Sequence, residues 1–216
     1  MRLWRSRSAG NIAALSRVEI ANSGGTPLCE LDLLAADVPS GDVITVPECN
    51  LTAVSGAATV YRVRVLPKGH ADMPAAEVAV TAYVSAVQSG YAERIYQDLT
   101  GGPITFDNLP PAAPAWVLAA AADAQANLEW TAVSDANLYL VLRGQSAVTA
   151  APEENTTYAV GATLGDATVR HWSANTSLND TGLANASAYH YRLAARDSCG
   201  NWSSGIHAGP LVPRGT

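Results

Sequence analysis

The residues best suited to acid, base or metal chemistry in this sequence are its four histidines. They are widely spaced, at His70, His171, His190 and His207. None of them belongs to the His-Glu-x-x-His pattern of a zinc peptidase helix. The sequence also lacks a Gly-x-Ser-x-Gly elbow, a phosphate-binding glycine loop and an Asp-x-Asp-x-Asx-Gly calcium loop. We therefore expect no catalytic residue, no cofactor, no metal and no enzyme activity.

The three cysteines are too scattered for a metal cluster, because none forms a Cys-x-x-Cys pair. Cys29 and Cys49 could form a disulfide within the first half of the chain, which would leave Cys199 over. Alternatively, all three thiols are packed as small apolar side chains or placed in turns. The sequence leaves both alternatives open, and with them the redox compartment.

Charge and hydropathy exclude two classes of partner. The chain of 216 residues has 13 basic and 19 acidic residues and a net charge of −6, so it offers no broad cationic surface for nucleic acid. No window approaches the roughly 20 apolar residues that a membrane-spanning helix needs. The start of the chain has the charge of a signal peptide but not its continuous apolar segment.

Both ends of the chain are expected to lie outside the folded domains. Residues 1–14 are interpreted as a basic flexible arm, in which Arg2, Trp4 and Arg5 could contact an acidic partner subunit. Residues 209–216 contain Leu-Val-Pro-Arg-Gly-Thr, which resembles a thrombin cleavage sequence left by a tag, and they are excluded from the expected fold.

Short segments of alternating apolar and polar residues, separated by turn residues, predict strands in the first half of the chain. In residues 59–69, apolar side chains lie on the face opposite two arginines, as in a half-buried strand. Residues 71–90 could begin a helix after Asp72, but their alternating valines favour a strand. We expect a β-sandwich-like domain over residues 15–109.

A glycine and proline cluster in residues 99–116 predicts a boundary between two domains, because such residues cannot continue a strand ladder. Beyond it, turn signals recur about every 8 to 15 residues, as a seven-stranded sandwich requires. A sandwich core also needs large inward aromatic side chains. The candidates are Trp130, Tyr139, Tyr189 and Tyr191.

Residues 110–208 resemble a fibronectin type III domain of the kind found in bacterial and bacteriophage proteins. The resemblance is carried by the opening Pro-Pro-Ala-Ala-Pro, Trp130 in the second strand, the third-strand sequence Tyr-Leu-Val-Leu-Arg, Leu183 placed shortly before Tyr189, and the closing Arg-Leu-Ala-Ala-Arg-Asp-Ser-Cys-Gly-Asn-Trp-Ser. It implies a corner in which the hydroxyl of Tyr189 bonds to the backbone. The predicted fold class is all-β, with two tandem β-sandwich domains.

A stripe of leucines suggests a partner surface on the second domain. If Tyr139 and Val141 face the core, then Leu138, Leu140 and Leu142 lie on the outer face of the same strand, where water would favour polar residues. We expect this face to dock on the first domain or on another protein. A register slip or a bulge would instead exchange the two faces.

Trp202, in the last turn, could contact a ligand or pack on the edge of the sandwich itself. The resemblance implies little about activity, because its family consists chiefly of spacer and binding modules.

The favoured hypothesis is a non-catalytic structural or adhesive protein of a phage virion or bacterial surface. It would present a protein-contact surface on its tandem sandwiches to other protein subunits, as a homo-oligomer or in a virion. The expected location is the virion or the outside of the cell.

The alternative is a carbohydrate-binding or spacer module from a secreted polysaccharide-degrading enzyme, with a surface glycan as partner. It would need exposed, coplanar aromatic rings. An enzyme site in the first domain would need a cleft around His70, Asp72 and Glu77, which only their proximity in the sequence supports.

Overall fold

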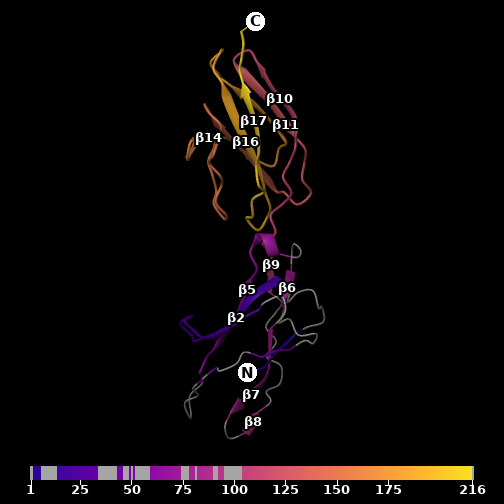
Figure 1. Ribbon diagram of the computed structural model, residues 1–216, viewed down its shortest axis with the longest axis vertical. Helices are drawn as coiled ribbons and strands as arrows, with labels where there is room; N and C mark the ends of the chain where they lie inside the picture. Colours follow the sequence, from indigo (N-terminus) through magenta and orange to yellow (C-terminus); the bar gives the residue numbers. More distant parts are fainter. Residues whose placement is uncertain are drawn as a thin grey trace. The chain divides into compact units, whose positions relative to one another are not determined.

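The computed structural model describes most of the second half of the chain and several parts of the first half (Figure 1). The described residues are 2–5, 14–33, 43–45, 49, 51, 59–73, 78–80, 82–89, 92–94 and 104–215. The chain divides into two units, residues 1–109 and 110–216, and the division lies directly before Pro110 and Pro111. The fold is all-β, and the described helical element of the first unit is a single short 3-10 turn, η2 (His70–Asp72).

The first unit contains three groups of antiparallel strands. One sheet has the order β4-β1-β7-β8, a second has the order β3-β2-β5, and β6 pairs with β9. Within residues 71–90, Val78–Val80 and Ala82–Ser89 form strands, as their alternation predicts, whereas Ala71 and Asp72 belong to η2. The bounds are β1 (Arg2–Arg5), β2 (Leu15–Ala21), β3 (Pro27–Asp32), β4 (Val43–Thr45), β5 (Arg62–Pro67), β6 (Val78–Val80), β7 (Ala82–Ser89), β8 (Ala92–Arg94) and β9 (Ile104–Phe106).

The expected flexible arm does not hold for residues 2–5, which form β1 between β4 and β7. The reason is the backbone: a strand placed between two others satisfies its N–H and carbonyl groups in both ladders, whatever its charge. The side chains of Arg2, Trp4 and Arg5 lie outside the described residues, so their expected partner contacts stay a prediction.

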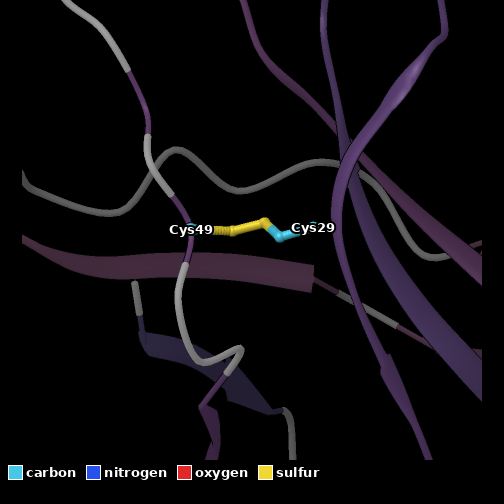
Figure 2. Close-up of a disulfide and its surroundings, with 2 residues drawn as sticks. All are labelled: Cys29 and Cys49. Carbon is cyan, nitrogen blue, oxygen red and sulfur yellow. A yellow bond between two sulfur atoms is a disulfide. The ribbon is translucent and has the colours of Figure 1, made fainter.

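The described core of the first unit lies on one face of β2. Leu15, Val18 and Ile20 are buried there with Leu33, and the apolar side chains of β5 pack against them while its arginines are exposed. Cys29 of β3 and Cys49 belong to the same cluster and form a disulfide (Figure 2). The structure therefore selects this pairing, while Cys199 lies exposed in the second unit.

The second unit is a fibronectin type III-like sandwich. One sheet has the order β10-β11-β15 and the other the order β13-β14-β12-β16-β17, with every pair antiparallel. The two-residue β13 is added to the seven strands that the sequence predicts. The bounds are β10 (Trp116–Ala122), β11 (Gln125–Trp130), β12 (Leu138–Gly144), β13 (Thr163–Leu164), β14 (Ala167–Ser173), β15 (Ser177–Thr181), β16 (Tyr189–Arg196) and β17 (Ile206–Leu211).

The space between the two sheets is filled by the predicted aromatic residues. Trp130, Tyr139, Tyr189 and Tyr191 are all buried in one cluster. The Tyr189 hydroxyl accepts a hydrogen bond from the backbone N–H of Ala184, at 3.0 Å. This hydrogen bond confirms the predicted corner. A buried hydroxyl needs a hydrogen-bond partner, and here the partner is a backbone N–H in the segment just before β16.

The outer leucine stripe is not exposed, which corrects the expectation of a partner surface. Leu140 and Leu142 are 1% and 0% exposed, and Leu138 is half-buried beside them. The segment between β12 and β13 crosses this face and covers it with Val148, Ala150 and Tyr158 in a second apolar cluster. The stripe therefore packs within its own unit, and its inward and outward registers are as predicted.

Trp202 is also buried in this second cluster, and its indole N–H donates to the carbonyl oxygen of Glu153 at 3.1 Å. It packs on its own sandwich, so the alternative role of a ligand contact does not hold.

The last strand, β17, includes residues from the range 209–216, which we expected to lie outside the fold because of their resemblance to a cleavage sequence. Leu211 pairs with Tyr189 in the ladder between β16 and β17. Pro213 is buried, and its carbonyl oxygen accepts a hydrogen bond from the N–H of Ala186, at 2.8 Å. The resemblance of this segment to a cleavage sequence is local, whereas its pairing is a long-range contact. The sandwich therefore extends beyond residue 208.

Among the described residues, no helix has the length and apolar character that a membrane-spanning segment needs.

Candidate functional site

The carboxylate of Asp180 on β15 is a fully buried charge of the second unit. It accepts hydrogen bonds from Arg143 at 3.0 and 3.1 Å, from Arg170 at 2.8 Å and from the hydroxyl of Tyr191 at 2.9 Å. Burial raises the pKa of Tyr191, and the negative charge of Asp180 raises it further. Both oxygens of this carboxylate accept hydrogen bonds. Asp180 therefore has a structural role, because it joins β15 to three strands of the opposite sheet.

His171 is the buried histidine of the second unit. Its ring meets Trp130 edge on, with 5.2 Å between ring centroids, and its Nε2 lies 3.1 Å from both the Asn175 carbonyl oxygen and the Ser173 hydroxyl. Burial lowers the pKa of His171. The neutral imidazole fits this setting, because an uncompensated positive charge would be costly beside the core.

Two carboxylates hold loops in place. Asp166 accepts hydrogen bonds from the N–H groups of Thr149 and Ala150, at 2.8 and 2.9 Å, and these bonds lower its pKa to about 2. Asp197 accepts from the N–H groups of Gly200 and Asn201, at 2.7 and 2.9 Å, within the last turn. Carboxylates that accept hydrogen bonds from backbone N–H groups in this way are typical of loops that connect strands.

The aromatic residues available for sugar stacking do not share a plane. The rings of Tyr158 and Trp172 are inclined by 74°, and those of Trp172 and Trp202 by 50°. Trp116 meets Trp130 at 90° within the core. A flat aromatic platform, which the carbohydrate-binding alternative requires, is not formed by these side chains.

Two further histidines line a pocket of about 300 Å³ on the sheet that contains β16 and β17. His190 lies on β16, and His207 on β17 pairs with Arg192. The guanidinium of Arg192 donates to the Thr149 and Ala150 carbonyl oxygens, at 3.1 and 2.8 Å, so this side chain holds the segment between β12 and β13.

The outermost strand β10 carries the most exposed apolar side chains described in the second unit besides Val160. Val117 is 65% exposed and Leu118 is 39% exposed. Residues 116–122 contain no charged residue and no proline. A bulge at Val117 displaces it from the ladder with β11, whereas Leu118 to Ala122 pair regularly. An uncharged apolar edge strand is a ready site for pairing with another strand.

The other outermost strands of this unit all have features that hinder pairing. β17 contains Pro210, which has no N–H to donate, and β13 has only two residues. β15 carries the inward charge of Asp180. Among the outermost strands of the second unit, β10 is the one with neither proline nor charge, and its protection is limited to the bulge at Val117 and to the approach of β17 near Ala121 and Ala122.

A groove of about 360 Å³ adjoins β10 at its C-terminal end. It is lined by Ala121 and Ala122 of β10 and by Pro210, Leu211, Val212 and Arg214 at the end of the chain. The small alanine side chains leave this space open next to the edge of the sheet. The candidate functional site of the described residues is therefore this edge and its groove, which we call the β10 edge (residues 116–122).

The sequence contains a signal for the β10 edge, although the predicted contact residues lie elsewhere. Trp-Val-Leu-Ala-Ala-Ala-Ala has neither charge nor the alternation of a strand with one wet face. This run could be recognised as unusual, but the sequence alone does not show whether it lies at an edge or in the interior.

No family model matches the chain, and no curated protein does. Similar solved structures include a Fn3-like protein from Clostridium thermocellum, which is 24% identical over 45% of this chain and 90% of that chain, with a TM-score of 0.31. The twitchin kinase region from C. elegans is 19% identical over 49% of this chain and 17% of that chain, with a TM-score of 0.34.

A beta-1,2-glucanase from Parabacteroides distasonis is 15% identical over 100% of this chain and 27% of that chain, with a TM-score of 0.33. The chain thus spans well under two thirds of the twitchin region and of the glucanase. The fibronectin type III-like fold of the second unit rests on its own strand order and its tyrosine corner.

Proposed function

We propose that this chain is a non-catalytic structural or adhesive protein of a phage virion or bacterial surface, and that it works by holding protein-contact surfaces on rigid sandwiches. The observation that carries the proposal is the β10 edge. Its exposed Val117 and Leu118 lie on an uncharged strand that is hydrogen-bonded to a neighbouring strand on one side, which is a surface suited to a protein and not to a soluble small molecule.

The disulfide between Cys29 and Cys49 supports a location outside the reducing cytoplasm, because disulfides persist in oxidising surroundings. A virion protein meets this condition after release from the cell, and a surface protein meets it throughout. The resemblance of residues 110–208 to bacterial and bacteriophage domains favours the same setting.

The rigidity of the second unit also supports a presenting role. Asp180 joins the two sheets, and Asp166 fixes the start of the segment that crosses the outer leucines. Buried and fully bonded polar groups of this kind specify one arrangement of the strands. A contact surface built on such a framework loses little conformational entropy on binding.

The test is size-exclusion chromatography with light scattering on the full chain over a wide range of concentration, combined with electrophoresis in gels that contain polysaccharide. The proposal predicts a defined oligomer whose mobility polysaccharide does not change. A monomer that is retarded by polysaccharide would overturn the proposal in favour of a carbohydrate-binding accessory module.

A further inference from the structure

The ladder between β16 and β17 places two histidines on the same face of one sheet. His207 lies directly opposite Arg192, and residues opposite each other in an antiparallel pair point to the same side. His190 is two residues before Arg192 on β16, so it shares that face. His190 and His207 are therefore diagonal neighbours on adjacent strands, a placement from which aromatic side chains can reach each other. Both line the same pocket of about 300 Å³.

The strands on either side of His190 leave room around its imidazole. Its neighbour across the ladder with β12 is Gly144, which has no side chain. On the other side, the register shift between Tyr189 and Tyr191 brings Gly209 next to it, and a Cβ on Gly209 would lie 3.3 Å from the His190 Nδ1. Gly209 has a φ of +122°, a backbone conformation that favours glycine. The two glycines therefore keep this imidazole clear of neighbouring side chains.

Neither imidazole is used by the fold. The ring of His171 has hydrogen-bond partners, whereas no hydrogen bond or ion pair joins His190 or His207 to another residue of the described part of the chain. His190 is half-buried and His207 is exposed, so both remain available to a ligand. A neutral imidazole offers the lone pair of one ring nitrogen, which is a preferred donor for zinc, copper and nickel.

The positive charge of Arg192 on the same face is bound elsewhere. Its guanidinium donates to the carbonyl oxygens of Thr149 and Ala150, and a Cβ on Gly205 would lie 2.7 Å from its Nε. The guanidinium is thus held toward the Gly205 end of β17, whereas the pocket lies at the Gly209 end. The net charge of −6 of the whole chain favours the approach of a cation.

We propose that His190 and His207 together bind one divalent transition-metal ion of the class that imidazole prefers, such as Zn²⁺, Cu²⁺ or Ni²⁺. Each histidine supplies one ring nitrogen at about 2 Å, and water completes the tetrahedral coordination of zinc. The spacing from which we expected no metal compares neighbours on a helix, whereas these two histidines meet through the pairing of two strands. The site goes beyond the proposed function, which requires no metal.

The test measures the affinity of the full chain, without a histidine tag, for Zn²⁺ by isothermal titration. Every protein carries Cys199→Ser, which removes the exposed thiol as another ligand. We expect one ion per chain. His190→Gln and His207→Gln should each weaken binding about tenfold or more, because one imidazole alone cannot chelate the ion. His70→Gln, in the first unit, is the matched control and should bind Zn²⁺ like the parent protein.

A second measurement does not depend on these variants. In NMR spectra of the Cys199→Ser protein, Zn²⁺ should shift the imidazole signals of His190 and His207 together and leave those of the buried His171 in place. An affinity that is unchanged in both glutamine variants, or reduced in only one of them, overturns the shared site. A titration that shifts neither imidazole, or only one, also overturns it. These results leave the proposed function in place.

Discussion

At the scale of single residues, the carboxylates of Asp166, Asp180 and Asp197 and the imidazole of His171 form hydrogen bonds that stabilise the fold of the second unit. His171 illustrates how burial sets the chemistry of a group: its ring is packed against Trp130, and its Nε2 has two polar neighbours. Burial lowers its pKa because the charged form loses hydration that these neighbours do not replace. A residue type that often acts as an acid or base here contributes to packing.

The lowered pKa of His171 predicts how stability depends on pH. The unfolded chain binds a proton at this imidazole more readily than the folded chain, so the contribution is fully present above about pH 6.5 and is lost as the pH falls through the folded pKa. Urea unfolding of the wild type and His171→Asn at several pH values measures it. The variant should lose part of the pH dependence below about pH 6.5, and an identical pH dependence in both proteins would contradict the assignment.

At the scale of elements, the second unit is held together by contacts between strands far apart in the sequence. The segment between β12 and β13 covers Leu140 and Leu142. Hydrogen bonds to Asp166 and Arg192, which lie outside the segment, hold it in place. Asp166 accepts from the N–H groups at its start, and the guanidinium of Arg192 donates to the Thr149 and Ala150 carbonyl oxygens at 3.1 and 2.8 Å. This cover turns an exposed apolar face into a second core.

The bonds of Asp180 predict a large effect of a single substitution. Asp180→Asn leaves Arg143 and Arg170 without a counter-charge, and these side chains are 22% and 27% exposed, so part of the cost is relieved by water. We expect a loss of about 3 kcal/mol in the free energy of unfolding, measured by urea denaturation. Glu129→Gln, on the exposed face of β11, is the control and should change it by less than about 0.5 kcal/mol. Equal effects of the two variants would rule out a special role for the buried carboxylate.

At the scale of the whole molecule, the chain consists of two units with separate stabilising devices. The disulfide lies in the first unit, and the tyrosine corner and the charge cluster of Asp180 lie in the second. Four of the five tryptophans, Trp116, Trp130, Trp172 and Trp202, also lie in the second unit. Tryptophan fluorescence therefore reports mainly on the second unit.

Removal of the disulfide should affect the two units differently. Cys29→Ala together with Cys49→Ala removes a link that closes a sequence separation of 20 residues, which should cost the first unit about 3 kcal/mol. Circular dichroism during thermal unfolding should show an earlier first transition, while the transition followed by tryptophan fluorescence stays unchanged. A parallel shift of both transitions would show that the second unit depends on the first for its stability.

The two-residue alternation of the sequence was sufficient for the fold class and for the core of the second unit. Trp130, Tyr139 and Tyr191 are buried where their spacing predicts, because residues at even intervals along a strand share a face whatever the rest of the chain does. The hydrogen bond that the Tyr189 hydroxyl accepts comes from Ala184, five residues earlier, and it was predicted from the resemblance to fibronectin type III domains.

Only the tertiary structure decided which faces and edges remain open to a partner. The leucines on the outer face of β12 have the apolar pattern of a contact surface, yet contacts such as that of Trp202 with Glu153 bring a distant segment over them. The order of strands in a sheet likewise depends on long-range pairing, and it places β10 at an edge. Local periodicity determines which side of a strand is apolar, whereas the burial of that side depends on the packing of the whole unit.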